Sequence, residues 1–160
     1  MTSPLIPVPR AAGDHLPADE TPAFDWGLVE TALTRTTDAR DGFQRMQELA
    51  EPGFAPTVAR FLDLHRRHSD RIARLMAEAG RVPDADGSLM GRVNRLVVSA
   101  RALVDRIDAD TLPQIVSGET HVLEAYDAAL AGAAPQGVRD ELAALRDDLA
   151  DLLATVSPPG

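Results

Sequence analysis

Cysteine is absent from the 160-residue chain, so the protein has no disulfide, no thiolate metal ligand and no cysteine nucleophile. Any metal ion would have to be held by histidine and carboxylate side chains. Aromatic residues make up only 4% of the chain, so a core must come mainly from Leu, Val, Ile and Ala. Such a core suits packed helices, and the length and the hydrophobic content of 44% fit one domain. We therefore expect a single all-α domain.

Positive charge is scarce, because 16 basic residues face 25 acidic ones and leave a formal net charge of −9. Nucleic acids and anionic membranes bind positive surfaces, so both are disfavoured as partners. No apolar run approaches the roughly 20 residues of a membrane-spanning helix. The first residues, MTSPLIPVPR, lack the basic start and the unbroken apolar run of a signal peptide. The expected location is the cytoplasm.

The motifs of common enzyme classes are also missing. The chain has no Gly-x-Ser-x-Gly nucleophile turn, no phosphate-binding glycine loop and no dinucleotide fingerprint. Ser99 and Ser117 have no neighbouring histidine that would activate them. A metal-dependent activity is the one enzymatic interpretation that stays open.

Prolines mark the organisation of the chain. Residues 1–22 hold five of the twelve prolines and show no helical periodicity, which predicts an extended or disordered arm. This arm is either a flexible leader or a docking peptide whose Leu5, Ile6 and Val8 enter the groove of a protein partner. We expect the helical bundle to span residues 23–157, followed by a short tail at 158–160.

Five segments carry apolar residues at helical spacing between the proline breaks, and none of them predicts a strand. Gly80 is expected to end the second helix. Periodicity leaves two topologies open: a ferritin-like four-helix bundle with a helical crossover between its second and third bundle helices, or a plain five-helix array. The predicted helices cover residues 25–50, 57–79, 88–107, 110–131 and 136–156, and the last has a strict apolar seam of Val138, Leu142, Leu145, Leu149, Leu152 and Val156.

Polar residues interrupt two of the apolar stripes. Glu119 shares a helical stripe with apolar residues, and a buried carboxylate is costly unless it has a partner. His65 and His68, spaced i, i+3, lie on the inward stripe of the second helix. These three side chains predict either a polar layer that fixes helix register, with the histidines bonded to Glu119 or Tyr126, or a metal site. In the metal site His65, His68 and Glu119 are the ligands, Tyr126 lies just outside them, and Asp38 is a further candidate ligand.

Several short motifs occur in order along the chain: Asp38 with Gly42-Phe43, then Gly87-Ser88-Leu89 with Gly91 and Arg95, then Gly118-Glu119 followed by Tyr126 and Ala129-Leu130. This order resembles an uncharacterised bacterial family of small ferritin-like four-helix bundles, a domain of unknown function. The resemblance implies the ferritin-like topology and kinship with proteins that hold two metal ions, but no established activity. The chain departs from the pattern at Asn94, where a histidine is expected, and in its last helix, which lacks one.

A complete di-metal site in such a bundle needs a Glu from each of two helices and a Glu-x-x-His pair from each of the other two. The sequence supplies too few of these ligands. It therefore favours a non-enzymatic ferritin-like bundle that has no cofactor, acts as a binding or interaction protein and forms a homo-oligomer through an apolar helix face. The alternative is a bundle that binds iron or a single divalent metal such as zinc or manganese, with oxidative or storage chemistry.

Overall fold

The computed structural model describes residues 23–82 and 106–156, and the regular elements within these ranges are helices. They are α1 (Trp26–Leu49), α2 (Ala55–Glu78), the short 3₁₀-helix η1 (Ala109–Thr111), α4 (Leu112–Ala131) and α5 (Gln136–Val156). The described residues hold no β-strand and a single isolated bridge, between Ala50 and Ile107. The prediction of an all-α fold is confirmed.

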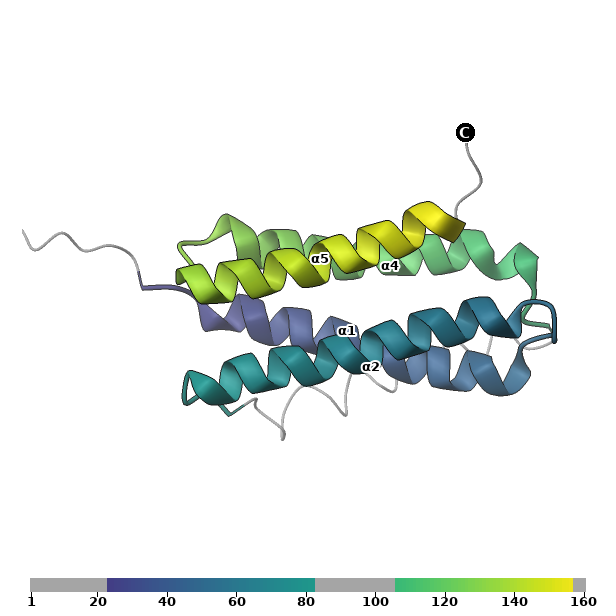
Figure 1. Ribbon diagram of the computed structural model, residues 1–160, viewed down its shortest axis with the longest axis horizontal. Coiled ribbons are helices and arrows are strands. Elements are labelled where there is room, and N and C mark those ends of the chain that lie inside the picture. The colour runs from purple at the N-terminus through teal and green to yellow at the C-terminus, as the bar shows by residue number, and fades with distance from the viewer. Residues whose placement is uncertain (1–22, 83–105, 157–160) are drawn as a thin grey trace, which may run out of the picture.

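The four long helices lie side by side along one axis (Figure 1). Helix α1 packs against α2 and α4, and α5 packs against α4 and α2. Neighbouring helices run antiparallel, so α2 and α4 run in the same direction on one diagonal of the bundle (Figure 1). The end of α2 and the start of η1 lie at opposite ends of the bundle. Within the described residues, no helix combines the length and the apolar character needed to cross a lipid bilayer.

The starts of the helices follow from local sequence. The carboxylate of Asp25 accepts a hydrogen bond from the backbone N–H of Gly27 (2.9 Å) and caps α1. Pro56 and Pro113 lie in the first turns of α2 and α4, where a missing N–H breaks no intrahelical bond. Helix α2 therefore begins at Ala55, before the proline that was predicted to precede it.

Gly80 stops α2, as its sequence position predicts. Its backbone has a φ of +69°, which glycine adopts at no steric cost. The N–H of Gly80 bonds to the carbonyl of Ala77, and the N–H of Arg81 bonds to that of Met76. These two bonds form a Schellman motif. The guanidinium of Arg81 also lies over the ring of Trp26, 5.7 Å from its centre, so the end of α2 is held against the start of α1.

The predicted helix over residues 88–107 lies outside the described residues except at its last two positions, and those two are not helical. Ile107 forms the bridge with Ala50, and its carbonyl accepts a hydrogen bond from the N–H of Glu51 (2.9 Å). Ile107 is buried, so this apolar side chain closes the end of the bundle. The arm at residues 1–22 and the tail at 158–160 also lie outside the described residues.

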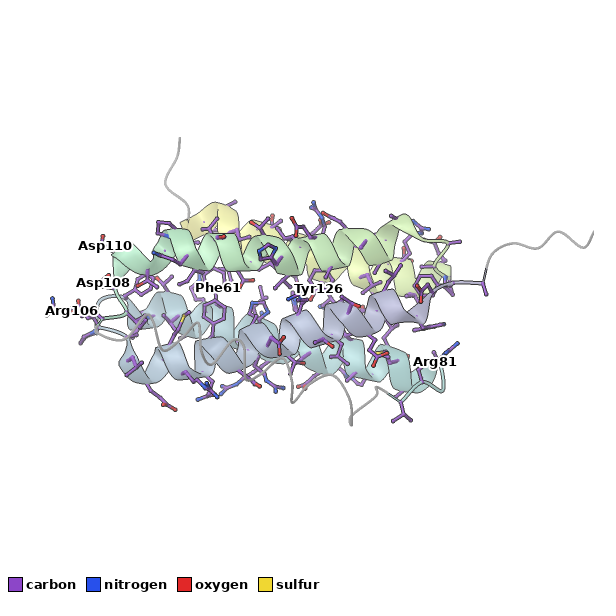
Figure 2. All side chains as sticks on the ribbon, turned by 180° about the vertical axis from the view of Figure 1, so that it is seen from behind. Phe61, Arg81, Arg106, Asp108, Asp110 and Tyr126 are labelled. Atoms are coloured by element: carbon purple, nitrogen blue, oxygen red, sulfur yellow. The ribbon has the colours of Figure 1, made fainter. Side chains whose placement is uncertain are left out.

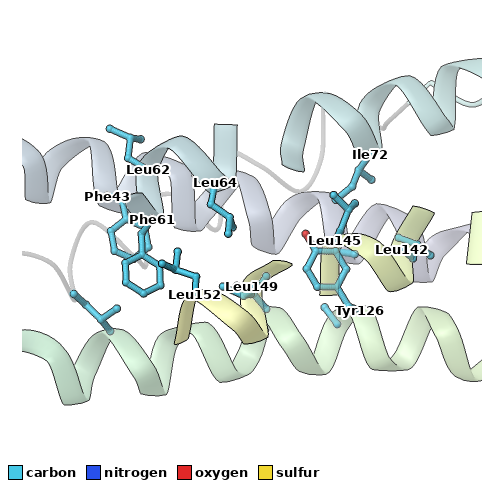
Figure 3. Close-up of a cluster of buried hydrophobic side chains, with 14 of the residues drawn as sticks. Phe43, Phe61, Leu62, Leu64, Ile72, Tyr126, Leu142, Leu145, Leu149 and Leu152 are labelled. Atoms are coloured by element: carbon cyan, nitrogen blue, oxygen red, sulfur yellow. The ribbon is translucent and has the colours of Figure 1, made fainter. Parts of the chain in front are cut away.

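The core is built mainly from aliphatic side chains. The predicted seam of α5 is buried at Val138, Leu142, Leu145, Leu149 and Leu152, and Val156 is partly buried. Figure 3 shows leucines of this seam together with the stacked rings of Phe43 and Phe61, whose centres are 5.0 Å apart. On α1 the inward face includes Val29 and Thr36, which are fully buried, while Leu28, Ala39 and Met46 are only partly buried.

Candidate functional site

A histidine and a carboxylate meet inside the bundle. His65 on α2 and Glu119 on α4 are 0% and 2% exposed, and His65 Nε2 lies 3.0 Å from Glu119 Oε2. Since α2 and α4 are diagonal neighbours, this hydrogen bond crosses the interior. The imidazole of His65 also stacks on the ring of Phe43, with centres 5.5 Å apart. The buried carboxylate thus has the partner that its burial demands.

A second set of polar groups lies one turn further along α2. His68 Nδ1 is 3.2 Å from the hydroxyl of Tyr126, and that hydroxyl is 3.0 Å from Oγ1 of Thr36. All three side chains are fully buried, and they connect α2, α4 and α1. Figure 3 shows Tyr126 pointing from its helix into the cluster of buried leucines. We refer to Thr36, His65, His68, Glu119 and Tyr126 as the polar layer.

His68 also faces α5. Its Nε2 lies 3.6 Å from Oδ2 of Asp148, which is longer than a hydrogen bond but close enough for electrostatic attraction. Asp148 is half exposed and lies 3.5 Å from Arg71. Arg71 in turn forms a bidentate ion pair with Glu141, with N–O distances of 2.7 and 3.1 Å. The polar layer is therefore coupled to charged groups on the surface between α2 and α5.

Burial sets the protonation of His68 and Tyr126. Desolvation, followed by the nearby His65, lowers the pKa of His68 to about 4, although Asp148 acts in the opposite direction. Desolvation raises the pKa of Tyr126 to about 12, against the effect of its hydrogen bond with Thr36. At pH 7 His68 is therefore a neutral imidazole beside a protonated phenol. This arrangement supplies hydrogen-bond donors and acceptors but no charged nucleophile.

The described residues do not fit a di-metal centre. Among residues 23–82 and 106–156, no group of three or more His, Cys, Asp or Glu side chains is arranged to hold a metal ion. The inward seam of α5 consists of valine and leucine, where such a centre requires a carboxylate or a Glu-x-x-His pair. Two buried nitrogens, His65 Nδ1 and His68 Nε2, lack a hydrogen-bond partner in the described part of the chain.

Two further titratable residues, Asp38 and His121, lie at a cleft of the bundle. Asp38 is buried on α1 and lines a cleft between α1 and α4, and Glu119 lines the same cleft. His121 is exposed and pairs with Glu124 of its own helix at 3.0 Å. The structure thus brings His65 and Glu119 together, and places His68 with Tyr126, in one interior layer.

Two members of this environment were not predicted from sequence. Thr36 lies four residues after Ala32 and seven before Phe43, so it occupies a core position of the α1 stripe. The signal that identified Glu119, a polar residue on an apolar stripe, would also have identified Thr36. Asp148 carries no such signal, because it borders the seam of α5 and its contact with His68 depends on how α2 and α5 pack.

The comparisons with known proteins give a family and no individual relative. No curated protein and no solved structure matches the chain. Residues 29–132, from the first turn of α1 to the end of α4, match the model of a family described as Domain of unknown function (DUF2383). That match includes the whole polar layer and leaves α5 outside. The resemblance of its short motifs to a domain of unknown function is confirmed in that respect. Because the match covers more than half of the chain, the protein belongs to this family of unknown function.

Proposed function

We propose that this protein is a non-enzymatic, ferritin-like helical bundle of the cytoplasm that acts by binding another molecule, and that the polar layer is structural. The observation that carries the proposal is the mutual hydrogen bonding of the polar layer. His65 is bonded to Glu119, and Tyr126 links His68 to Thr36. Polar groups bonded to one another in a dry interior specify how helices pack, and they are not available to a substrate.

The order of the helices supports the ferritin-like part of the proposal. Ferritin-like bundles join two antiparallel helix pairs by one long connection. Here α1–α2 and α4–α5 are antiparallel pairs, and the chain leaves α2 at one end of the bundle and re-enters at η1 at the other. A five-helix array remains the alternative, since the predicted helix over residues 88–107 lies outside the described residues apart from its last two positions.

A metal-binding bundle is the second candidate, and the two unpaired imidazole nitrogens favour it. His65 Nδ1 and His68 Nε2 are buried without a hydrogen-bond partner in the described part of the chain, and neutral imidazole is a common ligand of zinc and iron. A single ion held by His65, His68 and Glu119, with Asp38 as a further ligand, would require these side chains to move closer together, because no three of them are grouped to hold a metal ion within the described residues.

Metal content separates the two candidates. The full chain, purified without chelator from medium containing iron, zinc and manganese, should carry far less than one metal ion per chain. Its melting temperature should not change when EDTA or Zn²⁺ is added. Stoichiometric metal that is lost in Glu119→Gln but kept in His121→Gln would overturn the proposal. His121 is the matched control, because it is an exposed histidine already paired with a carboxylate.

Self-association is part of the same proposal. Leu49 is 64% exposed at the end of α1, and we take this apolar side chain as the candidate contact with a second copy. Light scattering after size-exclusion chromatography should show a homo-oligomer that Leu49→Glu weakens. A monomer at all accessible concentrations would refute this part. Deletion of residues 1–22 tests the separate idea that the arm binds a protein partner, which should then no longer co-purify.

A further inference from the structure

The cleft between α1 and α4 is a hollow of about 270 Å³ on one side of the bundle. Its apolar lining comes from the second half of α1, the first half of α4 and the segment before η1, and includes Phe43, Met46, Ile107, Ile115 and Val122. Gly118 leaves the α4 side open, because a Cβ atom built there would meet nothing within 4 Å. Apolar side chains dominate the walls of this hollow, which suits an alkyl chain.

Two unpaired cations stand at this cleft. Arg35 and Arg45 line it, both are exposed, and among the described residues they are the arginines without a hydrogen bond, ion pair or ring contact. Every other described arginine is engaged with an oxygen atom of the protein or, in the case of Arg81, with the face of Trp26. In a chain of net charge −9, these are two cations, each without a partner in the described part of the protein.

The carboxylates of the same cleft do not cancel these cations. Glu119 is 2% exposed and its Oε2 is bonded to His65. Asp38 is buried and has an interaction partner of its own. The charges available to a ligand are therefore the guanidinium groups at the mouth of the cleft, while the interior offers apolar surface.

We propose that this cleft binds a single-chain fatty carboxylate, with the alkyl chain among the apolar side chains and the carboxylate at Arg35 or Arg45. The inference rests on the proposed binding function and names its ligand class. Guanidinium and carboxylate form two parallel hydrogen bonds, which gives the head group a preferred partner. Binding tail-first keeps the ligand carboxylate in water at the mouth, away from Glu119.

Calorimetric titration of the full chain with decanoate below its micelle concentration tests the proposal. Decyltrimethylammonium and decanol are the matched probes with a cationic and a neutral head group. Decanoate should bind tightest, and octanoate should bind more weakly by about fourfold for each CH₂ removed, the value expected for burying a methylene group. Equal affinity for all three head groups, or no binding of decanoate, would overturn the proposal.

Variants locate the binding site. Gly118→Leu fills the cleft and should abolish decanoate binding, while Gly137→Leu, which adds the same side chain on α5 where a Cβ atom also meets nothing, should leave it unchanged. The double variant Arg35→Gln, Arg45→Gln should weaken decanoate about tenfold and leave decanol unchanged. Arg60→Gln, which removes a cation on α2, is its control.

Two outcomes would assign the cleft differently. Decanoate binding that survives in Gly118→Leu would place the ligand elsewhere and refute the proposal. A dimer that Gly118→Leu disperses, in a chain that does not bind decanoate, would show that a second copy occupies the cleft. Circular dichroism of each variant should show unchanged helicity. Failure of decanoate binding leaves the metal content unaffected, so this inference and the proposed function can fail separately.

Discussion

His65 and Glu119 are bonded to each other across the bundle, with 3.0 Å between Nε2 and Oε2, and neither side chain reaches solvent. The pair belongs to two helices that lie on a diagonal of the bundle and meet through side chains of the polar layer, including His68 and Tyr126. A polar contact placed there is sensitive to any sliding of α2 along α4. It therefore defines the relative position of the two helices more strictly than leucine packing does.

Removing one partner of this pair should be far more costly than removing both. His65→Leu leaves a buried carboxylate without its bond, and we expect the free energy of unfolding to fall by about 3–5 kcal/mol. The double variant His65→Leu, Glu119→Leu should recover much of that loss, because no member of the pair is then left in the core without its partner. Urea unfolding followed by circular dichroism measures both. A loss below about 1 kcal/mol in His65→Leu would mean that Glu119 finds another partner.

The hydroxyl of Tyr126 should stabilise the fold through two helices at once. Tyr126→Phe removes the group between Thr36 and His68, and we expect a loss of about 1–3 kcal/mol in urea unfolding, the cost of leaving buried partners unsatisfied. Thr36→Val should also destabilise, and the double variant should lose less than the sum. Thr120→Val, which removes an exposed hydroxyl bonded within α4, should change stability by no more than about 0.5 kcal/mol. Additive losses would contradict a shared network.

Stability should rise with pH between about 4 and 6.5. Burial lowers the pKa of His68 to about 4 from its ordinary value of 6.5, so in this interval the unfolded chain takes up a proton that the folded chain does not. The contribution of neutral His68 to stability is fully present above pH 6.5 and is lost as pH falls towards 4. One pKa unit corresponds to about 1.4 kcal/mol, so the change approaches about 3 kcal/mol.

Two measurements test this titration. The free energy of unfolding in urea should depend less on pH in His68→Gln than in the wild-type chain over the same interval. In NMR spectra at pH 5.5, the ring resonances of His68 should be those of a neutral imidazole. The ring resonances of the exposed His121 serve as the internal reference. A protonated His68 ring at pH 5.5 in the folded protein would contradict the prediction.

Two glycines should respond to alanine in opposite directions. Gly118 lies inside α4 with open space around it, so Gly118→Ala should stabilise the protein by about 0.5–1 kcal/mol through helix propensity. Gly80 has a φ of +69°, so Gly80→Ala should destabilise it by about 1 kcal/mol. Thermal unfolding of the two variants side by side measures the difference. If both changes stabilise the protein, the Schellman geometry at the end of α2 is wrong.

The sequence predicted the helices well where the apolar spacing is regular. The seam of α5 has one inward residue every three or four positions, and helix geometry alone turns these to one side. The sequence predicted the local structure poorly where a residue contacts a segment that is distant along the chain. Ile107 continues an apolar periodicity but pairs with Ala50, and nothing in the local pattern distinguishes the two uses.

The residues of the candidate site were predictable from the sequence, but their pairing was not. Glu119 and the two histidines were identifiable as polar residues on apolar stripes, and the requirement for a partner follows from the cost of a buried charge. The pairing itself depends on helix register, which periodicity does not fix. The sequence therefore left His65 with two candidate partners, Glu119 and Tyr126, and the structure assigns Glu119 to His65 and Tyr126 to His68.

Asp148 is half in water, while the ring that it attracts is sealed inside the bundle. Dissolved ions reach the carboxylate of Asp148 but not the imidazole of His68. Added salt therefore screens the attraction between this carboxylate and a proton on His68. High ionic strength should accordingly make His68 still harder to protonate. The protonation of this buried histidine thereby depends on the salt concentration, although its own side chain has no contact with solvent.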